Sequence, residues 1–141
     1  MVQVRDVPGL APDPEAAHRH VIGWLVPAEE RKRLLEQFAP AYERTVADHV
    51  TLKAGVVEDA PPPPPVEAEV VGVADDGKGV QALVVRIDGS TERPGGGVWH
   101  ITWSLGQMRK AKESNDVIAR EGWRDLDEPV PVRLEPGRFY G

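Results

Sequence analysis

The chain has 141 residues, no cysteine and a formal net charge of −6. This length fits one domain with a single core, and the lack of cysteine excludes a fold held together by disulfides. The negative charge argues against a long nucleic-acid footprint, because such binding depends on neutralising many phosphates. No run approaches the roughly 20 apolar residues of a membrane helix, and the N-terminus lacks the pattern of a signal peptide. We therefore expect a cytoplasmic monomer that contacts no membrane.

The first half of the chain predicts a strand, a helix and a second strand after an extended, proline-containing lead-in at 1–17. Residues 20–26, HVIGWLV, form a short apolar run that is typical of a strand. Residues 27–40, PAEERKRLLEQFAP, begin with proline and two early glutamates and end with proline, which indicates a helix. Residues 45–57, TVADHVTLKAGVV, are rich in β-branched residues and predict the second strand.

A proline run at 60–65, APPPPP, divides the chain near its middle. Consecutive prolines adopt a stiff left-handed extension, so we interpret this run as a spacer between two lobes of a single domain, 1–141. Lobe one covers about 18–58 and lobe two about 66–141. The alternative is that the run is a ligand for proline-binding modules, although no basic residue flanks it.

The second half predicts three strands, a helix and a final strand. The strands are VEAEVVGVA, VQALVVRID and VWHITWSL, the helix starts at Ser114 in SNDVIAREGW, and the last strand lies in VPVRLEPGRFYG. The loop GSTERPGGG, 89–97, lacks the lysine and the strand–loop–helix context of a phosphate-binding loop, so we expect a mobile connection. The element order predicts an α+β fold with antiparallel sheets, a helix on each lobe and a central cleft.

Two of the four histidines share one three-residue frame, His49-Val50-Thr51 and His100-Ile101-Thr102. Residues i and i+2 of a strand face the same side, so each histidine projects beside its threonine. An imidazole moves a proton near neutral pH, and a hydroxyl donates a hydrogen bond to an anionic oxygen. Two such half-sites supply an acid, a base and two oxygen ligands, which is the set that phosphodiester cleavage needs. Two ordinary strands are the alternative explanation.

The motifs HVTL and HITW in this α+β chain resemble the two-histidine (2H) phosphoesterase superfamily. Similar members are the cyclic phosphodiesterase domain of fungal-type tRNA ligases and RNA 2′,3′-cyclic phosphodiesterase (2′-5′ RNA ligase-like) proteins. The resemblance implies a two-lobed fold and a site without metal or cofactor, in which His49 and His100 are acid and base and Thr51 and Thr102 bind phosphate oxygens. It leaves open which histidine is the base. The short spacing between the motifs and Trp103 in the second motif depart from the family pattern.

Five further residues are candidates for substrate contacts. Lys53 and Ser104 lie two positions beyond the threonines and share their strand face. Arg109 and Lys112 belong to the basic run RKAKESN after the second motif, and Tyr140, next to Phe139, is placed to cover a nucleobase. Solvated side chains or ordinary packing are the alternatives for each. Trp103 faces away from His100 and is expected in the core.

The expected function is metal-independent opening of a 2′,3′-cyclic phosphate at an RNA end or on a small nucleotide. The alternatives are a binding module for an RNA end or a nucleotide phosphate, and 2′-5′ RNA ligation by the reverse reaction. His18 and His20 have spacing suited to a metal, but no cysteine or suitably spaced acidic residue accompanies them, so we expect surface histidines and no metal site.

Overall fold

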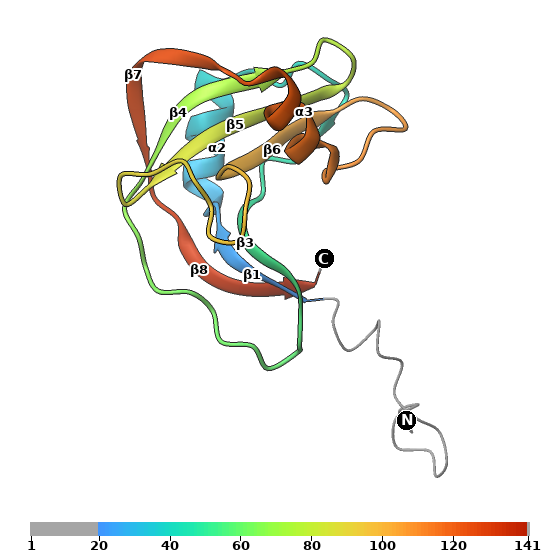
Figure 1. Cartoon of the computed structure of the whole chain (residues 1–141). Coiled ribbons are helices and arrows are strands. Elements are labelled where there is room, and N and C mark those ends of the chain that lie inside the picture. Colours follow the sequence, from blue (N-terminus) through green and yellow to red (C-terminus); the bar gives the residue numbers. More distant parts are fainter. Residues whose placement is uncertain (1–19, 141) are drawn as a thin grey trace, which may run out of the picture.

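A computed structural model describes residues 20–140; the lead-in at 1–17 and His18 lie outside this range. Within it, the fold is α+β: an eight-stranded sheet, antiparallel in every pair, with two helices (Figure 1). The elements are β1 (His20–Leu25), α2 (Ala28–Gln37), β2 (Arg44–Thr45), β3 (His49–Val56), β4 (Ala68–Asp75), β5 (Val80–Ile87), β6 (His100–Leu105), α3 (Glu113–Glu121), β7 (Arg124–Val132) and β8 (Glu135–Tyr140).

The sheet joins both halves of the chain. Its strand order is β7-β4-β5-β6-β3-β1-β8, and the short β2 also pairs with β6. The last strand, β8, pairs with β1 although it lies in the second half of the sequence, and β2 of the first half pairs with a strand of the second. Strands β3 and β6 meet at the centre through the pair Val50–Ile101, and β1, β3 and β8 curve away from β4, β5 and β6 beyond it (Figure 1).

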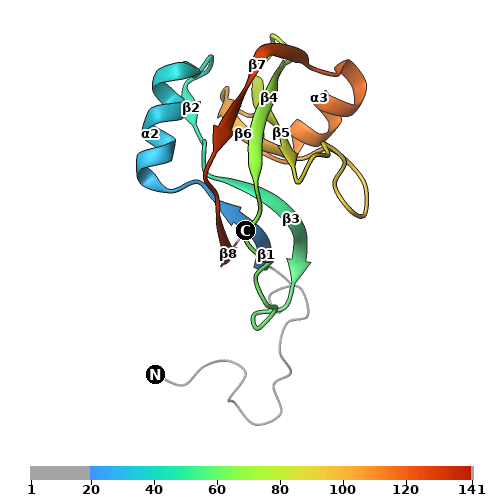
Figure 2. The same cartoon turned by 90° about the vertical axis from the view of Figure 1, so that its left-hand side faces the viewer.

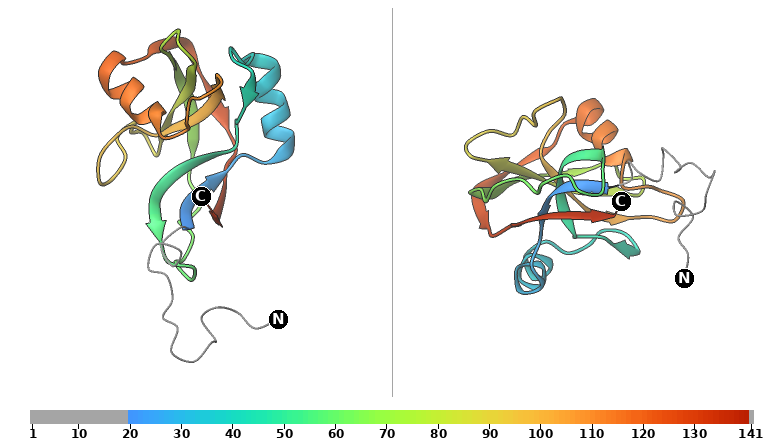
Figure 3. Two further views of the ribbon diagram at one scale, coloured as in Figure 1. Left: turned by 90° about the vertical axis from the view of Figure 1, so that its right-hand side faces the viewer. Right: turned by 90° about the horizontal axis from the view of Figure 1, so that it is seen from below.

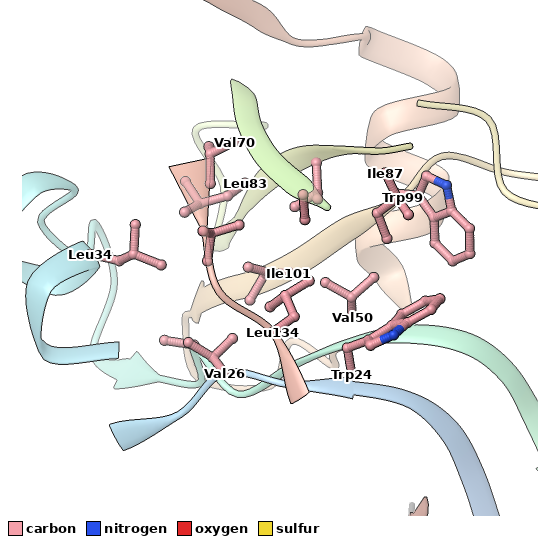
Figure 4. Close-up of a cluster of buried hydrophobic side chains, with 14 of the residues drawn as sticks. Trp24, Val26, Leu34, Val50, Val70, Leu83, Ile87, Trp99, Ile101 and Leu134 are labelled. Carbon is pink, nitrogen blue, oxygen red and sulfur yellow. The ribbon is translucent and has the colours of Figure 1, made fainter. Parts of the chain in front are cut away.

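The two helices lie on opposite faces of the sheet (Figures 2 and 3). Leu34 of α2 packs into the main core with Val50 and Ile101 (Figure 4). The same core contains the fully buried Trp103, which confirms the core position expected for it. At ten and nine residues, neither helix in the described part of the chain is long enough to cross a membrane.

The α3 face has its own smaller clusters, in which Ile118 packs against the alternate side chains of β5, Ala82 and Val84. Both faces of β5 and β6 are therefore covered, which explains why all six residues of β6 are buried. His100 and Thr102 alternate with Ile101 and Trp103 along β6, so they face the α3 side.

The second predicted strand is interrupted just before the first motif. The register of the chain against β6 shifts between Thr45, which pairs with Ser104, and Val50, which pairs with Ile101. Ala47 lies in this break, fully buried and with a φ of 47°, and the Arg31 side chain donates hydrogen bonds to the carbonyls of Val46 and Ala47. An irregular residue fixed by a distant arginine leaves no local sequence signal, so the break was not predicted.

The proline run connects the two halves but is anchored along its length. The Trp24 indole donates a hydrogen bond of 2.9 Å to the carbonyl of Pro64, and Arg138 donates one of 2.8 Å to the carbonyl of Ala60. Pro63 is buried. The run is therefore tied to β1 and β8 by two hydrogen bonds, while its other four prolines stay exposed.

Candidate functional site

The pairing of β3 with β6 brings the two histidine motifs together at the centre of the sheet. Val50 pairs with Ile101, and extending this antiparallel register by one residue each way sets His49 opposite Thr102 and Thr51 opposite His100. Directly opposed residues have Cβ atoms about 5 Å apart. The side chains of His49 and Thr51 point away from the main core, as do those of His100 and Thr102. The four side chains therefore form one cluster, related by an approximate twofold axis through the Val50–Ile101 pair.

His100 occupies the buried side of this cluster, with 8% of its surface exposed. Its Nδ1 lies 2.8 Å from the carbonyl oxygen of Val98, and because a carbonyl only accepts, Nδ1 carries the hydrogen. Burial lowers the pKa of His100 below its usual 6.5, and the nearby positive charges of Arg93 and His49 lower it further, against the Val98 hydrogen bond, which raises it. The ring is therefore neutral at pH 7, with a lone pair on Nε2.

His49 is more exposed and stands beside a carboxylate. Its Nδ1 lies 3.2 Å from Oδ2 of Asp48, and 28% of the side chain is exposed. The carboxylate accepts from Nδ1, so a protonated His49 keeps its second hydrogen on Nε2. The ring of Phe139 from β8 lies with its centroid 4.6 Å from that of His49, tilted by 57°. Phe139 therefore forms the apolar border of this half of the cluster.

The two threonines differ in their partners. Oγ1 of Thr102 lies 2.9 Å from Oγ of Ser114 and 3.4 Å from the carbonyl of Ala111. The hydroxyl of Thr51 is half-buried and makes no hydrogen bond to any residue between 20 and 140. Ser114 was expected to cap α3, but the cap is Lys112, and Ser114 lies inside the first turn with its side chain buried against Thr102. The sequence thus indicated the helix start but not the contact to the site.

Two of the predicted substrate contacts have structural roles instead. Ser104 is fully buried, donates to Oε1 of Gln81 at 2.5 Å and accepts from the amides of Ala41 and Tyr42. Arg109 forms ion pairs with Asp76 at 3.0 Å and with Glu113 at 3.2 Å, so its charge is already compensated. We therefore exclude both residues from the candidate site. Strand parity predicted that Ser104 shares the face of His100 and Thr102, but this prediction was wrong. The register of β6 against β5 shifts between Thr102 and Ser104, so Ser104 lies on the opposite face, where it contacts the segment that follows α2.

The remaining predicted contacts lie at the surface. Lys112 and Lys53 are exposed, and neither side chain has an ionic partner among the described residues. A register shift in the β1–β3 pair falls between Thr51 and Lys53, so strand alternation no longer places Lys53 beside Thr51. Tyr140 is 65% exposed and contacts His20, whereas its neighbour Phe139 reaches His49. The aromatic residue at the site is therefore Phe139 and not Tyr140.

His20 is half-buried in β1, not at the surface as expected. Its Nδ1 is buried and has no hydrogen-bond partner in the part of the chain that the structure describes. No group of three or more histidine, aspartate, glutamate or cysteine side chains suited to a metal ion occurs there either. The imidazoles of His49 and His100 and the hydroxyls beside them can transfer protons and form hydrogen bonds.

Sequence reasoning missed one basic residue, Arg93, in the loop between β5 and β6. Its charge acts on His100, and it donates hydrogen bonds to the carbonyl of Gly96 at 3.0 Å and to the side chain of Asn115 at 3.2 Å. The loop was expected to be a mobile connection, but these bonds tie it to the first turn of α3. Its run of glycines suggested flexibility, and nothing in the sequence indicated the contact to α3.

Two hollows in the surface lie away from the histidines. One, of about 420 Å³, is lined mainly by the end of α3 and the start of β7, including Trp123 and Arg124. The other, of about 520 Å³, lies between Phe38 and residues 126–130 of β7. Neither hollow is lined by a residue of the two motifs. Comparison of this chain with known protein families, with curated proteins and with solved structures found no match.

Proposed function

We propose that this protein is a metal-independent phosphodiesterase of the two-histidine type, with two lobes that meet at the motifs. Its substrate is a 2′,3′-cyclic phosphate at an RNA end or on a small nucleotide. The observation that carries the proposal is the Val50–Ile101 pair, which sets His49 opposite Thr102 and Thr51 opposite His100. If the two motifs were a coincidence, their strands could pair in any register. The observed register is the one that relates the motifs symmetrically.

In the proposed reaction His100 is the general base. Its Nδ1 is held by the Val98 carbonyl, its pKa is lowered by burial, and its Nε2 has a lone pair to accept a proton. Water loses a proton to Nε2 as its oxygen forms a bond to phosphorus. A base is effective when it is unprotonated at the working pH, and these surroundings keep His100 in that form.

His49 is the general acid. As the bond from phosphorus to one ribose oxygen breaks, the Nε2 hydrogen of a protonated His49 passes to that oxygen, and the product is a phosphomonoester. The Asp48 carboxylate at 3.2 Å is the counter-ion for the charged ring. Phe139 beside His49 offers an apolar surface to the nucleoside that carries the leaving oxygen. The position of Phe139 favours His49 as the acid, beside the nucleoside, and His100 as the base, beside the attacking water.

The threonine hydroxyls hold the non-bridging oxygens as negative charge develops there. Thr51 has a hydroxyl without a partner among the described residues, so it donates directly. The Thr102 hydroxyl accepts a hydrogen bond from Ser114. Its own hydrogen donates to the Ala111 carbonyl at 3.4 Å, and rotation of the hydroxyl directs this hydrogen to the phosphate instead.

The test is hydrolysis of nucleoside 2′,3′-cyclic monophosphates and of a short RNA with a terminal cyclic phosphate, with chelator present. His49→Ala and His100→Ala are the test variants. His20→Gln is the matched control, because His20 lies in β1 and packs against Tyr140 outside the cluster. We expect ring opening by the wild type and the control and a loss of at least about 100-fold in each test variant.

Wild-type protein that binds the cyclic phosphates but never opens them would favour a binding module over an enzyme. Activity that disappears with chelator would contradict the metal-independent mechanism. Circular dichroism of each variant separates loss of chemistry from loss of fold.

A further inference from the structure

Arg93 is fixed in place although it lies in a glycine-rich loop. Its Nε donates to the Gly96 carbonyl at 3.0 Å, its backbone amide donates to the Gly97 carbonyl at 3.0 Å, and Nη2 donates to Oδ1 of Asn115 at 3.2 Å. A Cβ on Gly97 would lie 2.8 Å from Nη2, and the φ of 89° at Gly97 also favours glycine there. The loop lies on the α3 side of the sheet (Figure 2).

The charge of Arg93 has no carboxylate partner between residues 20 and 140. Some arginines of this acidic chain are paired with acids, as Arg86 is with Glu69, whereas Arg31 and Arg138, like Arg93, donate to neutral carbonyls. Both side-chain partners of Arg93 are neutral, and they use two of the five N–H groups of the guanidinium. Both hydrogens of Nη1 and one of Nη2 remain available to bind an anion.

Arg93 is connected to the cluster through the first turn of α3, because its partner Asn115 follows Ser114, whose hydroxyl contacts Thr102. Arg93 and His49 are the two charged groups whose fields act on the His100 ring, and both lower its pKa. A half-buried cation beside a neutral base disfavours protonation of that base, and it attracts an anion to the same place. Both effects favour the proposed reaction if the anion is the phosphate that water attacks as His100 takes its proton.

We propose that Arg93 binds a non-bridging oxygen of the phosphate at the His100 end of the cluster, held in position by Asn115 and the Gly96 carbonyl. This inference rests on the proposed function and assigns a further substrate-binding residue to the same site. The guanidinium supplements the two threonine hydroxyls, because its paired N–H groups match phosphate oxygens in geometry and charge. Arg93 binds both the cyclic diester and the monoester product, and it holds the dianionic product more strongly.

The test compares Arg93→Gln, Arg93→Lys and Asn115→Ala with the wild type, and Arg120→Gln is the matched control. Arg120 is an exposed arginine of α3 whose neighbour is Glu121. Two quantities are measured: kcat/KM for a nucleoside 2′,3′-cyclic monophosphate across pH, and the affinity for adenosine 2′- and 3′-monophosphates by calorimetry.

We expect Arg93→Gln to lower kcat/KM by about 10- to 100-fold and to weaken monophosphate binding at least tenfold. Loss of the positive charge also raises the pKa of His100, so the acid limb of the pH profile moves to higher pH. Arg93→Lys restores the acid limb but only part of kcat/KM, since lysine lacks the two-pronged geometry. Asn115→Ala gives a smaller loss than Arg93→Gln, and Arg120→Gln changes neither quantity.

The outcomes separate this inference from the proposed function. An active wild type with unchanged kcat/KM, pH profile and binding in Arg93→Gln overturns the role of Arg93 alone. An inactive wild type that binds monophosphates in an Arg93-dependent way overturns the enzymatic function and supports the anion site. An inactive wild type that binds no monophosphate overturns both.

Discussion

The frame His-x-Thr occurs twice in this molecule, and its two copies lie in different surroundings. The copy in β6 belongs to a strand that is buried along its whole length, and its histidine is held by a backbone carbonyl. The copy in β3 lies where the strand leaves the centre of the sheet, and its histidine contacts a carboxylate and an aromatic ring.

This difference shows how two copies of one motif, in equivalent positions, can have histidines in unlike surroundings. The strand register makes the two copies equivalent in position, whereas burial lowers the pKa of His100 and the two histidines have different hydrogen-bond partners. Burial of His100 follows from its neighbours β5 and α3, and the greater exposure of His49 follows from the divergence of β3 from β6. In the proposed mechanism, acid and base are therefore distinguished by tertiary packing and not by the motif.

The largest expected difference between the two histidines should be seen with a substrate whose leaving group needs no proton. With thymidine 3′-(4-nitrophenyl phosphate), the nitrophenolate departs unprotonated, so we expect His49→Ala to keep activity within about tenfold of the wild type. His100→Ala should still lose about 100- to 10,000-fold, because the water still needs a base. Release of nitrophenolate, followed by absorbance, measures both.

With a 2′,3′-cyclic phosphate both variants should lose activity to a similar degree, which serves as the control. The reverse pattern on the nitrophenyl ester, with His49→Ala the more damaged variant, would exchange the roles of acid and base.

A second test uses the lowered pKa of His100. Because the folded protein protonates His100 less readily than the unfolded chain, stability rises with pH between the lowered pKa and the usual 6.5. The contribution is complete above about pH 6.5 and is lost as the pH falls through the lowered value. His100→Asn should flatten this part of the curve, measured as the free energy of unfolding by urea between pH 4.5 and 7.5.

His49→Asn is the matched control for this measurement, since His49 is the exposed member of the pair. The same pH dependence in His100→Asn as in the wild type would contradict burial as the cause of the His100 shift.

The threonines offer a comparison of smaller effects. Thr51→Val removes a hydroxyl that has no partner in the described chain, so we expect unchanged stability and a kcat about 10- to 100-fold lower. Thr102→Val should lower kcat and also destabilise the fold by about 1–3 kcal/mol, because Ser114 loses its buried partner. Equal stability loss in both variants would show that the Ser114 contact does not hold Thr102. Urea unfolding and steady-state kinetics give both values.

The sequence predicted well what depends on local pattern. The helix at 28–37, the β-strands around both motifs and the core position of Trp103 follow from apolar spacing and strand alternation, and the structure confirms them. The motifs also indicated which four side chains share a face, because alternation extends along a regular strand. The pairing of β3 with β6 makes that shared face a single cluster.

Features that depend on distant contacts were not predictable. The pairing of β8 with β1 brings Phe139 to His49, and the bond between Arg93 and Asn115 joins a loop to a helix. Neither leaves a signal in local composition. The break at Ala47 and the register shift beside Lys53 likewise arise from packing against other strands, and each disturbs the alternation on which the sequence argument relied.

The smallest expected effect on activity concerns Ser104. This residue lies on the same strand as His100 and Thr102 but has a structural role. It lies two residues beyond Thr102 on β6, but the register shift against β5 turns it to the opposite face, where it is fully buried between Gln81 and the amides of Ala41 and Tyr42. Ser104→Ala should therefore leave kcat/KM within about twofold of the wild type and destabilise the fold by about 1–2 kcal/mol, because these partners lose a buried hydrogen bond. Kinetics beside urea unfolding measure the two effects. A fall in kcat/KM without loss of stability would return Ser104 to the site and contradict the purely structural role that its partners on the opposite face indicate.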